Sequence, residues 1–125
     1  MENKKILIVD DEPAMIDIYA RELQDAGYDV SVATNGKEAI EFAASKKPDL
    51  VIMDVKMPEM DGVEATHQIK SNPETKDIKV IFLSAFGDPD AIATDKKYAQ
   101  EMGALDFIQK GLGLKEFTDR IKSFI

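Results

Sequence analysis

The segment LVIMDVKMPEMDG, residues Leu50–Gly62, decides the fold of this chain. It opens with consecutive apolar residues and reaches a carboxylate at Asp54. A short apolar run without polar alternation is typical of a parallel strand that is buried on both faces. Pro58 cannot donate to a strand ladder, and Asp61 followed by Gly62 signals the start of a helix. The segment therefore predicts a central strand that ends at Asp54.

Other apolar runs of the chain also end in polar residues. In an open parallel sheet, binding and catalytic groups gather at the carboxyl ends of the strands. We therefore expect the side chains that follow these runs to lie at one edge of a sheet. In chain order they are Asp10 and Asp11, Asp54, Ser84 and Lys110.

Apolar runs alternate with helical patterns along the whole chain, which is typical of a doubly wound α/β domain. The predicted strands are 5–10, 29–33, 50–54, 79–84 and 106–109. The predicted helices begin near Pro13, Gly36, Asp61, Pro89 and Leu114. Right-handed crossovers then give a three-layer (βα)5 sandwich with a parallel five-stranded sheet in the order 2-1-3-4-5. This order brings Asp10, Asp11 and Asp54 together where the strand order reverses.

The first predicted helix has a stripe of apolar residues at helical spacing. The residues of this stripe are Met15, Ile18, Tyr19, Leu23 and Ala26. We interpret Tyr19 as a structural residue of the core.

Composition limits the possible functions. A chain of 125 residues is expected to form one domain, 1–125, without an effector domain. Because its net charge is −8, direct binding to nucleic acid is disfavoured. The absence of Cys excludes disulfides and thiolate chemistry. The apolar runs are too short for membrane insertion, and no signal peptide precedes the first strand, so we expect a cytoplasmic protein.

Three carboxylates in one crevice repel each other, and burial adds a desolvation cost. A bound cation would relieve both effects. Oxygen ligands without His or Cys favour a hard ion, and Mg²⁺ is the common one in the cytosol. We expect Asp11 and Asp54 to bind Mg²⁺ directly and Asp10 to act through water.

With these residues in this order, the whole chain resembles the receiver domain of two-component response regulators. The resemblance implies that Asp54 is the phosphoacceptor, which takes the phosphoryl group from a phosphohistidine on a sensor histidine kinase or phosphotransfer protein. It also implies that Lys110 and Ser84 bind phosphoryl oxygens, and that the backbone carbonyl of Lys56 is a further Mg²⁺ ligand. Such a domain catalyses only its own phosphorylation and dephosphorylation and is not a metabolic enzyme.

The resemblance further implies a switch. Ser84 would move toward the phosphoryl group, and the aromatic residue of the last strand, here Phe107, would turn inward. An equally open interpretation is that Phe107 is a plain strand aromatic. The surface formed by the fourth helix, fifth strand and fifth helix would then contact a downstream protein target.

Two features depart from the family pattern. Gly111 follows Lys110 where the family usually has Pro, and Gly allows more backbone freedom than Pro. We therefore expect a more mobile loop that aims Lys110 less firmly. The span from Ser84 to Lys110 also looks about one helical turn longer than usual, and we place the extra residues at Ala93–Tyr98.

Two other functions remain open. The chain could be a protein-interaction module of the same fold that works without phosphorylation, and Gly111 supports this alternative. It could also be a small phosphatase with an Asp nucleophile. The sequence Asp10-Asp11-Glu12 disfavours the phosphatase, because such enzymes have a D-x-D pattern after the first strand.

Overall fold

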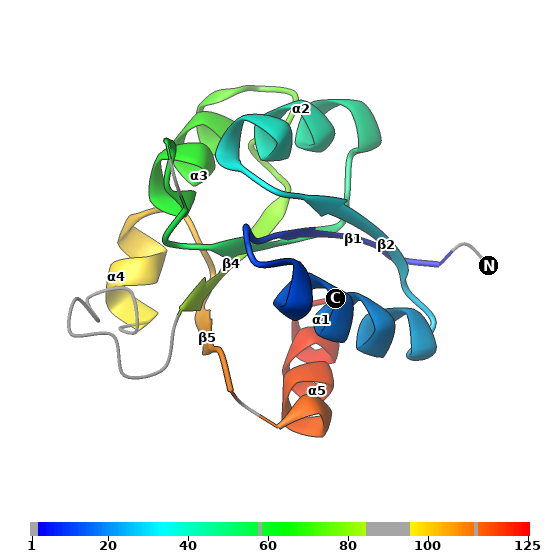
Figure 1. Cartoon of the computed structure of the whole chain (residues 1–125). Helices are drawn as coiled ribbons and strands as arrows, with labels where there is room; N and C mark the ends of the chain where they lie inside the picture. The colour runs from blue at the N-terminus through cyan, green and yellow to red at the C-terminus, as the bar shows by residue number, and fades with distance from the viewer. Residues whose placement is uncertain (1–2, 58, 85–95, 112) are drawn as a thin grey trace.

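The computed structural model describes residues 3–57, 59–84, 96–111 and 113–125. Within these ranges strands and helices alternate from end to end (Figure 1). The strands are β1 (Lys5–Val9), β2 (Asp29–Ala33), β3 (Leu50–Asp54), β4 (Lys79–Ser84) and β5 (Phe107–Gln109). The helices are α1 (Pro13–Asp25), α2 (Gly36–Lys46), α3 (Gly62–Ser71), α4 (Lys96–Glu101) and α5 (Leu114–Phe124).

The strands form one parallel sheet in the order β2-β1-β3-β4-β5, as predicted. All five residues of the central strand β3 are buried, which confirms the interpretation of its unbroken apolar run. The edge strand β2 is mostly half-buried. The sheet therefore has the doubly wound, flavodoxin-like α/β arrangement.

Helices cover both faces of the sheet (Figure 1). On one face, α1 and α5 pack on alternate strand residues such as Ile8 and Ile52. On the other face, α2, α3 and α4 pack on the intervening residues, such as Val9 and Met53. Because successive strand side chains point to opposite faces, each buried strand supplies both cores.

Several predicted boundaries differ slightly from the structure. β1 ends at Val9 and β5 begins at Phe107, so Asp10 and Asp106 lie just outside the strands. The predicted fourth helix, 89–102, falls partly on residues outside the described ranges, as do positions 93–95 of the expected insertion. In the described part, α4 ends at Glu101.

The predicted stripe of α1 was partly wrong. Tyr19 and Leu23 are buried, but Ile18 is 46% exposed and Ala26 is also exposed. Ala26 lies after the last residue of α1 and before Gly27, whose φ of +99° ends the helix. No helix in the described ranges is long and apolar enough to cross a membrane.

Candidate functional site

The strand register sets the positions of two acidic residues. Val9 of β1 is paired with Met53 of β3, so the residues that follow them, Asp10 and Asp54, lie level at the carboxyl ends of adjacent strands. Asp10 is fully buried and Asp54 is 3% exposed. Asp11, one residue further, is exposed. The topology thus brings the three predicted carboxylates to one edge of the sheet, two of them out of solvent.

Lys110 reaches the same edge from β5. Its backbone N–H donates to the carbonyl of Ser84 at 2.7 Å, in continuation of the pairing between β4 and β5. Its ammonium lies 3.1 Å from Asp10 Oδ2 and 3.2 Å from Asp54 Oδ2. A third contact, at 3.3 Å, joins it to Glu12 Oε1. One lysine therefore bridges the two buried carboxylates and an exposed one.

Burial and neighbouring charges shift the pKa values of Asp54 and Lys110 at this edge. Burial, and then repulsion from Asp10, raise the pKa of Asp54 to about 7, although Lys110 acts in the opposite direction. Burial by itself would lower the pKa of Lys110, but the neighbouring carboxylates outweigh burial and raise it. The carboxylates thus stabilise the ammonium form of Lys110, while a single ammonium does not fully compensate their charge.

The loop after β3 folds back over Asp54. The backbone N–H of Lys56 donates to Asp54 Oδ1 at 3.3 Å, and the N–H of Gly62 donates to the carbonyl of Val55 at 2.8 Å. Asp61, near which the sequence predicted the start of a helix, caps α3 by accepting from the N–H of Glu64. These bonds hold the Lys56 backbone beside Asp54.

The loop after β1 brings the carboxylates of Asp11 and Glu12 close to that of Asp10. Asp10 Oδ1 accepts from the N–H of Glu12 at 3.0 Å, which turns the chain into Pro13, the first residue of α1. Ligand oxygens of Asp10, Asp11 and Glu12 all lie within 4.8 Å of one another. Carboxylate oxygens are hard donors of the kind that Mg²⁺ prefers, so this set of ligands fits Mg²⁺.

Ser84 is the last residue of β4, at this edge, and Phe107 is the first residue of β5. Ser84 is 6% exposed, and its hydroxyl has no hydrogen-bond partner among the described residues. Phe107 is half-buried and packs against the core under α2, α3 and α4. A buried hydroxyl without a partner is costly, so Ser84 is suited to bind an added acceptor.

Gly111 adopts a φ of +96°, a left-handed conformation that Pro cannot reach. The loop therefore follows a path that a Pro at this position would not allow. The expected mobility of this loop stays a prediction. In the structure, however, the three carboxylate contacts already hold the Lys110 ammonium at the site.

Sequence reasoning did not assign Glu12 a role in the site. Its position directly after Asp10-Asp11 was the available signal, because a loop that leaves a strand can direct consecutive side chains toward the same crevice. It also did not foresee that burial raises the pKa of Tyr19, on which the charges of Lys110, Asp10 and Glu12 act as well.

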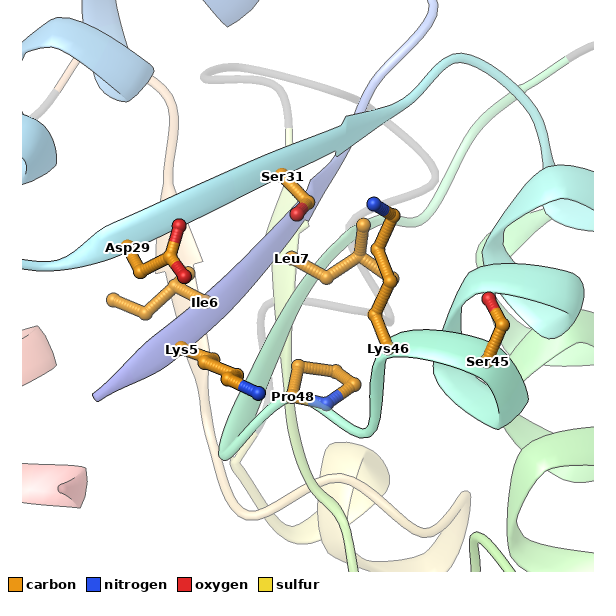
Figure 2. A pocket seen from close by; sticks show the side chains of 8 residues that line it. All are labelled: Lys5, Ile6, Leu7, Asp29, Ser31, Ser45, Lys46 and Pro48. Carbon is orange, nitrogen blue, oxygen red and sulfur yellow. The ribbon is translucent and has the colours of Figure 1, made fainter. Parts of the chain in front are cut away.

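One surface cavity, of about 290 Å³, lies away from this edge (Figure 2). Lys5 and Asp29, which line it, are the first residues of β1 and β2, and Lys46 is the last residue of α2. This cavity therefore opens at the amino ends of the strands, opposite the carboxylates. It contains none of the predicted site residues.

The fold and the site define a class of protein: a doubly wound domain with an acidic crevice and a lysine at the carboxyl edge of its sheet. The sequence model of the response regulator receiver domain matches residues 6–122. The chain therefore belongs to the family of response regulator receiver domains.

Known relatives cover this chain over nearly its full length. Sporulation initiation phosphotransferase F of Bacillus subtilis is 35% identical over 125 residues, which are 100% of this chain and 96% of that protein. The alkaline phosphatase synthesis transcriptional regulatory protein PhoP of the same organism is 34% identical over 98% of this chain, which spans 49% of PhoP. This chain thus corresponds to about half of some relatives and to nearly all of others.

A solved structure shows the same fold. The crystal structure of a putative response regulator from Chloroflexus aurantiacus is 32% identical, covers 98% of both chains and has a TM-score of 0.87.

Gly62 provides a test of how the loop after β3 holds Asp54. A Cβ at position 62 would overlap the carbonyl oxygen of Asp54 and lie 2.8 Å from Met53 Cγ. We expect Gly62→Ala to destabilise the fold by about 1–3 kcal/mol, the usual cost of overpacking, measured by urea unfolding.

Gly113→Ala is the matched control, because Gly113 has a φ of −56° and a Cβ there would have no neighbour within 4 Å among the residues that the structure describes. Its free energy of unfolding should stay within about 0.5 kcal/mol of that of the unchanged protein. Equal stabilities of the two variants would contradict the close approach at Gly62.

Proposed function

We propose that this domain accepts a phosphoryl group on Asp54 from a phosphohistidine of a sensor histidine kinase or phosphotransfer protein. The observation that carries the proposal is the Lys110 ammonium, shared at 3.1 and 3.2 Å between Asp10 and the buried end-of-strand carboxylate Asp54. Membership of the receiver family supports the same chemistry.

In the proposed step, a carboxylate oxygen of Asp54 attacks the phosphorus atom. The new P–O bond forms as the P–N bond breaks, and the electron pair of that bond returns to the imidazole, which takes a proton from solvent. Catalysis of such transfers consists mainly of positioning and of neutralising the equatorial oxygens. Lys110 supplies a positive charge beside Asp54. The hydroxyl of Ser84, which has no hydrogen-bond partner within the described part of the chain, can donate to another phosphoryl oxygen.

Mg²⁺ is the proposed cofactor. Asp11 and Asp54 would bind it directly, Asp10 would act through water, and the Lys56 carbonyl would complete the protein ligands. The clustered oxygens of Asp10, Asp11 and Glu12 support a cation at this place. When bound, Mg²⁺ supplies positive charge that neutralises the phosphoryl oxygens.

The proposed partners are proteins, in the cytoplasm. A net charge of −8 disfavours direct contact with nucleic acid. After phosphorylation, Ser84 and Phe107 would shift and change the surface of α4, β5 and α5, where a downstream protein would bind.

Intact-mass measurement tests the acceptor chemistry. Incubation with Mg²⁺ and acetyl phosphate should add one phosphoryl group to the protein. Asp54→Asn and a sample without Mg²⁺ should give no adduct. Asp11→Asn should need at least about ten times more Mg²⁺ for the same rate, because it loses a ligand.

Asp29→Asn is the control for the change in charge, because Asp29 is exposed at the opposite end of the sheet. Its adduct should form at the unchanged rate. No adduct on the unchanged protein, with Mg²⁺ binding shown separately, would contradict the proposal and favour a phosphorylation-independent interaction module.

Amide hydrogen exchange tests the switch. Phosphorylation adds charge and acceptors at Asp54, and it must bias an element with two states to have an effect elsewhere. We expect exchange to change in α4, β5 and α5 when acetyl phosphate and Mg²⁺ are present, with Asp54→Asn as the control. A change confined to α1 and α2 would contradict this output surface.

A further inference from the structure

Glu12 makes a contact across the site that its place at the start of α1 does not require. It is the N-cap residue of α1, a position where a short polar side chain commonly accepts a hydrogen bond from a backbone N–H of the first turn. The Glu12 side chain makes no such bond within the described part of the chain. Its carboxylate instead accepts a hydrogen bond from the Lys110 ammonium at 3.3 Å. Helix capping therefore does not explain this glutamate.

The three carboxylates around Lys110 differ in their access to water. The side chains of Asp10 and Asp54 are 0% and 5% exposed, whereas that of Glu12 is 62% exposed. A buried carboxylate that loses its positive partner becomes an uncompensated charge, which is strongly destabilising. An exposed carboxylate is rehydrated instead, and exposed ion pairs contribute little to stability. Glu12 is therefore the partner that Lys110 gives up at the lowest cost.

A phosphoryl group on Asp54 would need a hydrogen bond from Lys110. The ammonium donates to Asp54 Oδ2 at 3.2 Å and to Glu12 Oε1 at 3.3 Å. Asp10 Oδ2 lies 3.1 Å from it as an ion pair, although this oxygen accepts no hydrogen bond from the described residues. Because an ammonium has only three N–H groups, the bond to Glu12 competes with a bond to a phosphoryl oxygen.

The backbone around Glu12 is held independently of its side chain. The Glu12 N–H donates to Asp10 Oδ1 at 3.0 Å, and the Glu12 carbonyl accepts from the N–H groups of Met15 and Ile16, both at 3.1 Å. None of these bonds involves the Glu12 carboxylate. Rotation of the exposed side chain would therefore break the contact with Lys110 without movement of the loop or of α1.

We propose that Glu12 competes with the phosphoryl group for Lys110: it binds the ammonium until a phosphoryl oxygen at Asp54 replaces it, and so slows phosphorylation. The inference rests on the proposed function of Asp54 as the phosphoacceptor. In the phosphorylated protein Lys110 would already be bound to the phosphoryl group. Glu12 should therefore affect the formation of the adduct and leave its hydrolysis unchanged.

Glu12→Gln and Glu12→Asp test the inference together. Gln keeps the length of the side chain but lacks the charge that strengthens the bond, whereas Asp keeps the charge but is shorter and can cap α1 instead. With acetyl phosphate, and with Mg²⁺ at a saturating concentration for each variant, both adducts should form about two to five times faster, the range expected for the loss of an exposed ion pair. After removal of acetyl phosphate, both adducts should be lost at the unchanged rate.

Glu41→Gln is the matched control, because Glu41 is an exposed glutamate of α2, which covers the other face of the sheet from α1. Its adduct should form and disappear at the unchanged rates. Without acetyl phosphate, the Lys110 side-chain NMR signals should shift in both Glu12 variants, because both alter the contact with the ammonium. The same signals should stay in place in Glu41→Gln.

Faster adduct formation in Glu12→Gln alone would mean that removal of a negative charge near an anionic donor causes the effect, and this would overturn the inference. Unchanged or slower formation in both variants, an altered rate of adduct loss, or unchanged Lys110 signals would overturn it as well. If the unchanged protein formed no adduct, the proposed function itself would fail. Normal adduct formation that the Glu12 variants do not alter would leave that function intact and exclude only the competition by Glu12.

Discussion

The arrangement of the site depends on the ion pairs of Lys110, whose ammonium lies within 3.3 Å of three carboxylates. Two of these carboxylates, Asp10 and Asp54, are buried and would repel each other across adjacent strands. A buried charge is tolerated only when it is paired, so the lysine makes this sheet edge possible. Burial and the remaining repulsion from Asp10 raise the pKa of Asp54, and a divalent cation would relieve both effects.

The surrounding structure serves to bring these charges together. The register of β1 on β3 sets Asp10 beside Asp54. Gly62 lies close to the Asp54 carbonyl, and this close approach lets the loop between β3 and α3 fold over Asp54. On the other side, the pairing of β4 with β5 brings Lys110 to the same edge. The core on each face of the sheet therefore fixes the geometry of the charges, although the charges themselves contribute little to the burial of apolar surface.

The sequence predicted the parts of the fold that follow from periodicity and strand ends. Unbroken apolar runs located β3 and β4, and the polar β2 was correctly assigned to an edge. Ile18 was misplaced because its helical spacing is compatible with the stripe, and the rotation of α1 on the sheet, which spacing does not define, leaves it exposed. The contact of the Lys56 amide with Asp54 could not be predicted, because it depends on a loop path that has no sequence period.

Reduction of the acetyl phosphate-treated protein with borohydride, followed by peptide mass spectrometry, tests the central claim most directly. An aspartyl phosphate is reduced to homoserine, so the product marks the carboxylate that carried the phosphoryl group. The present account predicts homoserine at position 54 alone, and only after treatment in the presence of Mg²⁺. Homoserine at Asp10 or Asp11, or at no position, would contradict the assignment of Asp54 as the phosphoacceptor.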